Sequence, residues 1–241
     1  MLKDSILLEL ENNRSEYISG QMLAGRYGVS RNAVWKAINT LKKEGYQIDS
    51  VTNRGYVLRD DSDVLSLAGI KARMGDSCVH IIVQESLDST NNEAKRLLAT
   101  DCDLEHTLIV CNEQIKGRGR NGNSFNSPAD SGVYMTLVYK LIRPVNSPEY
   151  ANKITAQAVA RAVSDLCGIE LTINESGGIY YAGSKIGGIL IEAVTGLESG
   201  YIGHIITGIG IVPEHFTVSR NDLIAAITGR LMSVYSSDED F

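Results

Sequence analysis

The sequence lacks the features that mark membrane, secreted and zinc-binding proteins. No apolar run approaches the 18 residues that a membrane-spanning helix needs. Residues 1–17 lack a basic segment followed by an apolar stretch and a cleavage site, and they have the pattern of an amphipathic helix instead. The four cysteines are widely spaced without a C-x-x-C pair, which argues against a disulfide framework and a zinc site. We therefore expect a cytoplasmic protein with reduced thiols and no membrane segment.

Negative charge is unevenly distributed along the chain. The 241 residues have a net charge of −6, and 43% of them are hydrophobic, which is ordinary for a globular protein. Residues 1–60 contain nine Lys/Arg and seven Asp/Glu, whereas the remaining residues contain fourteen and twenty-two. A net negative charge normally counts against nucleic-acid binding. Because the first sixty residues are slightly basic, the charge does not exclude nucleic-acid binding by this part of the chain.

Residues 1–60 are predicted to form a winged helix-turn-helix domain. Two short helical patterns flank Gly28, which permits a tight turn, and Ser30 is a suitable N-cap for the second helix. The residues expected to face the core are Leu23 and Ala24 on the first helix and Val34, Ile38 and Leu41 on the second. Two alternating segments then flank residues 52–55, whose composition suits a hairpin turn, and the hairpin would be the wing.

The apolar stripe leaves a polar face at the start of the second helix, where recognition helices meet bases and phosphates. This face and the wing tip carry the residues expected to bind DNA: Ser30, Arg31, Asn32, Trp35, Lys36 and Arg54. The alternative is that these residues are merely solvated and that the domain binds another protein. Because one module of modest charge would bind weakly, we expect a homodimer on a double-stranded operator with two half-sites.

Residues 64–241 are predicted to form an α+β domain with a mixed or largely antiparallel sheet flanked by helices. Strand patterns occur at 79–87, 106–114, 132–141, 171–173, 184–195 and 201–211, and helical patterns at 88–99, 154–168 and 220–235. Several strand ends carry glycines and polar residues, and their convergence would form a small-molecule pocket. Taken singly, each of these residues is explained more simply as a turn, a helix cap or a surface lysine.

Four motifs behind the winged helix occur in the order of a known family. They are DSTN at 88–91, EQIKGRGR at 113–120, SKIGGILIEA at 184–193 and TGIGI at 207–211. With them the chain, to about residue 235, resembles the bifunctional biotin protein ligases that double as biotin operon repressors. The resemblance implies a class II synthetase-like domain that binds biotin, activates its carboxylate with ATP and transfers the biotinyl group to a carboxylase lysine.

The resemblance also implies roles for individual residues. Ser89, Thr90 and Gln114 would meet the ureido ring of biotin, which needs paired donors and acceptors. The other implied ligand-binding residues are Asn91, Gly117, Arg118, Gly119, Arg120, Lys185, Gly188, Gly208 and Gly210. Arg120 and Lys185 would face the carboxylate or its phosphate ester, and they would be the catalytic cations if the chain is active.

The chain departs from the family on the nucleotide side. The family's Lys-Trp-x-Asn-Asp motif, whose acidic end serves metal and nucleotide, is replaced by Asn-Glu-Ser-Gly-Gly at 174–178. Two cations of the loop are replaced by Asn121 and Asn123, and an asparagine by Val212. The sequence ends at Phe241, so we also expect the family's small C-terminal barrel to be absent. We therefore expect biotin to be bound without ATP or metal, and adenylation to be very slow.

Three functions are open at this point. The leading hypothesis is a DNA-binding repressor that senses biotin or a related small acid and is not an enzyme. The second is an active biotin protein ligase and repressor in which Glu175 and other groups replace the missing motif. The third is a DNA-binding dimer with a vestigial pocket. Because biotin without its nucleotide offers little differential binding energy, we expect the dimer to form without ligand.

Overall fold

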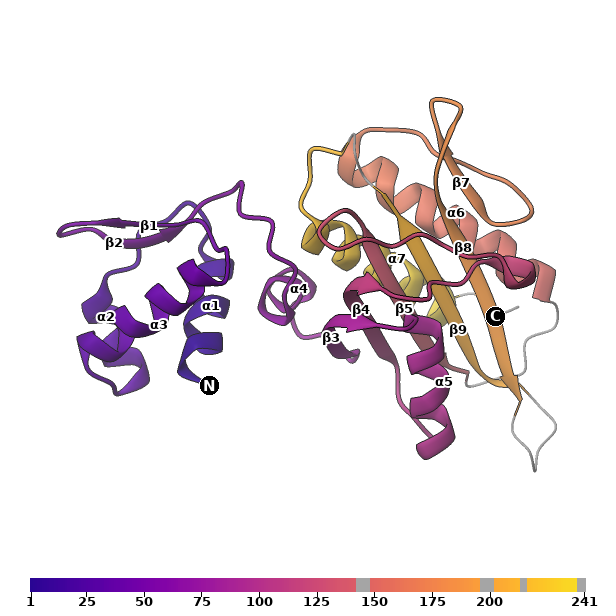
Figure 1. The fold of residues 1–241 in the computed structure, drawn as a ribbon. Helices are drawn as coiled ribbons and strands as arrows, with labels where there is room; N and C mark the ends of the chain where they lie inside the picture. The colour runs from indigo at the N-terminus through magenta and orange to yellow at the C-terminus, as the bar shows by residue number, and fades with distance from the viewer. Residues whose placement is uncertain (142–147, 196–201, 213–215, 238–241) are drawn as a thin grey trace. The chain divides into compact units, whose positions relative to one another are not determined.

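The computed structural model describes residues 1–141, 148–195, 202–212 and 216–237, and it divides into two compact units (Figure 1). The first unit comprises Met1–Asp76 and Ser219–Asp222, and the second comprises Ser77–Val218 and Leu223–Phe241. Within the described part of the chain, every helix is too short or too polar to cross a membrane.

The first unit contains the predicted winged helix. Its elements are α1 (Leu2–Asn12), α2 (Gly20–Tyr27), α3 (Arg31–Lys43), β1 (Ile48–Val51), β2 (Gly55–Leu58) and α4 (Leu67–Met74). Gly28 ends α2 with a left-handed φ of 63°, and the Ser30 hydroxyl accepts a hydrogen bond from the Ala33 amide at 3.1 Å, so both predicted signals are confirmed. Gly55 is required in the wing, because its φ is 115° and a Cβ there would lie 2.1 Å from the Ile18 carbonyl oxygen.

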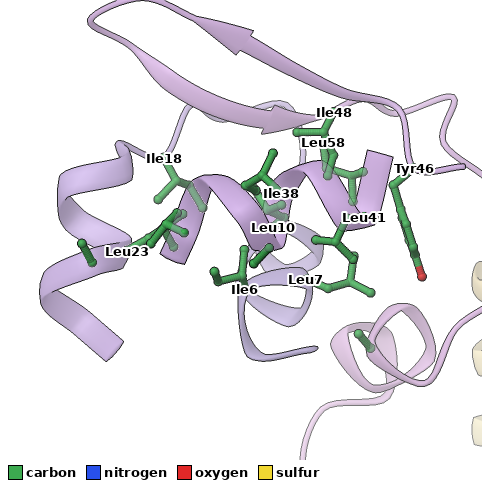
Figure 2. Packing of buried hydrophobic residues seen from close by; sticks show 14 residues of the cluster. Ile6, Leu7, Leu10, Ile18, Leu23, Ile38, Leu41, Tyr46, Ile48 and Leu58 are labelled. Carbon is green, nitrogen blue, oxygen red and sulfur yellow. The ribbon is translucent and has the colours of Figure 1, made fainter. Parts of the chain in front are cut away.

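The core of this unit is an apolar cluster to which helices α1, α2, α3 and α4 and the wing all contribute (Figure 2). The residues predicted to face inward, from Leu23 on α2 to Leu41 on α3, are all buried. Helix α4 was not predicted, and Ala68 at its start belongs to the same cluster. The first unit therefore extends past the boundary expected near residue 64. Beside this core the buried carboxylate of Glu11 accepts hydrogen bonds from Arg14 at 2.8 Å and Arg73 at 3.0 Å.

The second unit has the predicted α+β architecture, with a seven-stranded mixed sheet (Figure 1). The strands are β3 (His80–Leu87), β4 (Thr107–Gln114), β5 (Val133–Lys140), β6 (Thr172–Ile173), β7 (Gly178–Tyr181), β8 (Ser184–Thr195) and β9 (Ile202–Ile211). Their order is β3-β4-β5-β9-β8-β7-β6, and only the β3–β4 pair is parallel among the described pairs. Strand β7 was not predicted. The helices are α5 (Thr90–Thr100), α6 (Pro148–Cys167) and α7 (Arg220–Ser237).

The helices cover opposite faces of this sheet. Ala94 and Leu98 of α5 pack in one cluster with Ile206 of β9. The next residue, Thr207, points to the other face, where its hydroxyl lies 3.0 Å from that of Tyr235 on α7. Thr136 and Gly208 share the α5 face, since they lie two residues from members of that cluster on β5 and β9.

Candidate functional site

A cavity of about 330 Å³ lies where the four motifs meet on the α5 face of the sheet. This volume is within the ~300–1,000 Å³ range of small-molecule sites. Eleven of the twelve predicted ligand-binding residues line it: Ser89, Thr90, Asn91, Gln114, Arg118, Gly119, Arg120, Lys185, Gly188, Gly208 and Gly210. Segments that are more than 100 residues apart in the sequence are thus brought to one place by the neighbouring strands β4, β5, β9 and β8.

Gly117 is the predicted residue that does not line the cavity. It is buried, and a Cβ there would lie 2.3 Å from the Phe125 carbonyl oxygen. The Phe125 amide donates to the Gly117 carbonyl at 2.9 Å, and the Gly119 amide donates to Asn123 at 2.8 Å, so the loop folds back on itself. Gly117 therefore serves the turn of the loop.

Several residues that line the cavity were not predicted as part of it: Asn123, Ser124, Phe125, Ser176, Gly177, Gly178, Ile189, Leu190 and Ile209. A signal for Leu190 was available in the sequence, since it lies two residues after the predicted Gly188 and alternate residues of a strand share a face. No comparable signal existed for Ser176, because the loop before β7 reaches the cavity only through the sheet order.

Polar groups form one end of the cavity, which we call the head end and define by the buried Ser89, Thr90 and Asn91 and the half-buried Gln114. These residues come from the start of α5 and the end of β4. The Gln114 side-chain oxygen accepts from the Thr90 amide at 3.0 Å, and its Nε2 donates to the Ser127 hydroxyl at 2.8 Å. Ser89 is the N-cap of α5, yet its hydroxyl makes no capping hydrogen bond. The simpler interpretation, in which Ser89 only caps the helix, would require its hydroxyl to accept a hydrogen bond from a backbone amide of the first turn, and this hydrogen bond is not made.

Two glycines that line the cavity are closely approached by other side chains. A Cβ on Gly208 would lie 2.2 Å from Oδ1 of Asn91, and a Cβ on Gly210 would lie 2.3 Å from the Phe125 ring. The side chains that approach these glycines belong to the chain itself. Gly188 differs, since a Cβ there would meet its nearest neighbour at an ordinary 3.7 Å.

Cationic side chains form the opposite end, which we call the tail end and define by Arg118, Arg120 and Lys185. Arg118 and Lys185 are exposed, and their side chains make no hydrogen bond or ion pair with the described residues. The position of Arg120 is fixed by two hydrogen bonds. Its guanidinium donates to the Glu175 carbonyl at 3.0 Å and to Oδ1 of Asn152 at 2.5 Å. No aspartate or glutamate is among the described residues that line the cavity, so this end favours an anion.

The segment that replaces the family's acidic motif turns its carboxylate away from this cavity. Glu175 is exposed and lines a neighbouring cavity of about 690 Å³ together with Asn152 and Lys153 of α6. Over the described ranges, no three His, Cys, Asp or Glu side chains gather in a way that could hold a metal ion.

The predicted DNA-binding residues lie on the first unit. Arg31, Asn32, Trp35 and Lys36 are exposed on the first turns of α3, and Trp35 is 54% exposed. Arg54 lies at the turn of the wing, where its guanidinium stacks 4.0 Å above the ring of Tyr17. The Ser30 hydroxyl is occupied as the cap of α3. The structure thus places an unburied aromatic ring and several cations together on one helix.

Comparison with known protein families matches both units. An HTH domain family matches residues 3–57, and the biotin/lipoate A/B protein ligase family matches residues 83–211. This chain has a fold similar to that of the Helicobacter pylori biotin acetyl coenzyme A carboxylase synthetase, with a TM-score of 0.54 and 20% identity over 65% of this chain and 75% of that one. It is also similar to the *Leishmania major* biotin protein ligase, with a TM-score of 0.53 and 23% identity over 67% and 76%.

Curated relatives include the protein named bifunctional ligase/repressor BirA in several bacteria. The *Bacillus subtilis* protein is 33% identical over 220 residues, which are 89% of this chain and 67% of the relative. The *Escherichia coli* protein is 26% identical over 197 residues, 81% of this chain and 59% of the relative. The chain thus spans about three fifths to two thirds of the length of these relatives. Together with the match over residues 83–211, these similarities show that the chain belongs to the biotin/lipoate A/B protein ligase family.

Proposed function

We propose that the protein is a DNA-binding repressor that senses biotin or a related small acid through a ligase-like domain that has lost adenylation activity. The observation that carries this proposal is the contrast within one cavity. Its head end is a buried hydrogen-bonding site, while its cationic tail end lacks a carboxylate among the described lining residues. The repressor function is supported by the helix-turn-helix match and by the relatives, which are named bifunctional ligase/repressor BirA.

The chemistry of the cavity fits biotin at both ends. A urea ring has two N–H donors and one carbonyl acceptor, and the hydroxyls and amide of Ser89, Thr90 and Gln114 offer both kinds of partner. At the tail end Arg118 and Lys185 supply cations for the carboxylate. Biotin is therefore the ligand that we propose, with related acids such as lipoic acid as alternatives.

The same residues give little support for adenylation. In that reaction a carboxylate oxygen attacks the α-phosphorus of ATP and pyrophosphate leaves, so negative charge must be stabilised by cations and metal. The chain has neutral side chains at Asn121 and Asn123, and the nearby Glu175 carboxylate lies outside the lining of the cavity. Arg120 and Lys185 would be the remaining catalytic cations.

Calorimetry and a transfer assay test this proposal. We expect saturable binding of biotin by the full chain, no binding of ATP-Mg, and no biotin transfer to an acceptor domain in the presence of both. The absence of saturable biotin binding at millimolar ligand would contradict the sensor function.

The second candidate function is an active bifunctional ligase and repressor, which the names of the relatives favour. It predicts a streptavidin-detectable product with an acceptor domain, biotin and ATP-Mg. That product should disappear in Lys185→Ala, because the variant removes a cation from the tail end. Detection of such a product at ordinary enzyme concentrations would replace our first proposal with this one.

DNA binding and dimerisation complete the proposal. The exposed face of α3 would read an operator, and a homodimer would place two such faces on two half-sites. Selection of bound duplexes from a random library tests both points, since a dimer should enrich sequences with twofold symmetry.

A further inference from the structure

A hollow on the exposed side of α3 brings one aromatic ring together with three lysines. Its volume is about 660 Å³, and it is lined by Trp35, Lys36, Asn39, Thr40, Lys42 and Lys43. The core of the first unit is formed from the other side of α3, whose buried residues are Val34, Ala37, Ile38 and Leu41. Trp35 is 54% exposed, so more than half of its ring is available to a partner of this unit.

The charge of the hollow indicates what kind of partner covers the ring. No aspartate or glutamate is among the described residues that line it. Lys42 donates a hydrogen bond to the Ser50 hydroxyl of β1 at 2.9 Å, which is uncharged and leaves the positive charge of the lysine in place. Tryptophan anchors are frequent in protein–protein interfaces, but lysines are depleted there. An exposed tryptophan between three lysines therefore suits a polyanion such as DNA better than a second protein.

The chemistry of the major groove restricts what an indole ring can recognise there. The base edges present acceptors and amino donors, and the only apolar group among them is the 5-methyl group of thymine. Trp35 has a single N–H donor, so it cannot form the paired hydrogen bonds with which arginine or asparagine reads a base. It is the fifth residue of α3, within the first two turns, where a recognition helix meets base edges.

The geometry points to Trp35 as a specificity-determining residue that contacts the 5-methyl group of a thymine in the operator, while Lys36, Lys42 and Lys43 bind the phosphates beside it. This inference rests on the proposed function, because it names the base that the same face of α3 would read. It predicts a thymine at one fixed position of every half-site that the protein selects.

Replacement of thymine by deoxyuridine tests the contact directly, because it removes the methyl group and keeps the hydrogen-bonding groups of the base. A duplex selected from a random library by the full chain is resynthesised with one replacement at a time. Gel-shift titrations at low salt keep weak complexes measurable. We expect one replacement in each half-site to weaken binding about fourfold, which corresponds to the burial of one carbon. The other replacements should change affinity by less than about twofold.

Three variants assign this effect to Trp35. Trp35→Ala should bind the thymine and deoxyuridine duplexes equally, whereas Trp35→Phe keeps an apolar ring and should retain the preference for thymine. Lys36→Ala is the matched control, because the loss of a phosphate contact should weaken binding to both duplexes by the same factor and leave their ratio near four. Thermal unfolding establishes that each variant is folded. A merely structural role of Trp35 would leave the ratio between the two duplexes unchanged.

A wild-type protein that is insensitive to deoxyuridine at every thymine would overturn the inference. So would a Trp35→Ala variant that still prefers the thymine duplex, or selected half-sites without a common thymine. If the wild-type chain enriches no duplex from the library, the proposed DNA-binding function itself fails. The selection step thus separates failure of the function from failure of this inference.

Discussion

The recognition face of α3 and the head end of the cavity use polar residues in opposite ways. Arg31 and Lys36 on α3 are exposed, so they attract an anionic partner at a distance and are screened by salt. Thr90 and Asn91 at the head end are almost fully buried and hydrogen-bonded to neighbouring side chains. The first region is suited to a large, charged surface such as DNA, whereas the second is pre-organised for one small shape.

The largest expected effect is at the floor of the cavity. In Gly208→Ala the new Cβ would overlap Asn91 Oδ1, which lies 2.2 Å from its position. We expect biotin affinity to fall more than about 100-fold, and the free energy of unfolding to fall by about 1–3 kcal/mol, the usual cost of overpacking.

Gly203→Ala is the matched control, because it lies on the same strand and a Cβ there meets nothing within 4 Å. Calorimetry and chemical denaturation measure the two quantities. Unchanged binding in Gly208→Ala would mean that Asn91 is not part of the binding site.

The next effect concerns the recognition face. Arg31→Ala or Lys36→Ala should weaken binding to a duplex that carries one selected half-site by about 10- to 100-fold, corresponding to ~1–3 kcal/mol, and leave biotin affinity unchanged. Arg59→Ala removes the same charge from a residue that is paired with Asp61 at 2.6 Å, and it serves as the control. Gel-shift affinities that do not change in Arg31→Ala and Lys36→Ala would show that the face is misassigned.

Salt should affect DNA binding and biotin binding differently in the wild-type protein. Each phosphate contact lowers the logarithmic salt slope of DNA binding by about 0.9, so DNA affinity should fall steeply between about 50 and 200 mM salt. Biotin affinity should change less than about threefold, because most of its contacts are buried hydrogen bonds. An equal fall of both affinities with salt would contradict the proposed difference between the exposed, charged face of α3 and the buried head end of the cavity.

The smallest expected effect is on assembly. Biotin alone offers little differential binding energy, so we expect a dimer at micromolar protein with and without it. Sedimentation velocity would show one unchanged boundary. A monomer that dimerises only on addition of biotin would restore a ligand-driven mechanism.

Local signals in the sequence were sufficient for most elements. The Gly28 turn, the Ser30 cap and the α3 stripe are each determined within a few residues, and all are confirmed. Strand β7 and helix α4 were missed because each is short and has weak periodicity. Helix α4 is stabilised by packing on α1, which a local pattern does not reveal.

The sequence by itself determined the family, the winged helix and the identity of the polar residues in the cavity, because motifs and periodicity are local properties of the chain. Only the tertiary structure decided how those residues act. It turns Arg120 toward Asn152, places Phe125 over Gly210 and connects Thr90 to Glu192 through Thr136 and Asn91. Such contacts depend on strand order and register, which bring together side chains about 100 residues apart, and no local preference encodes them.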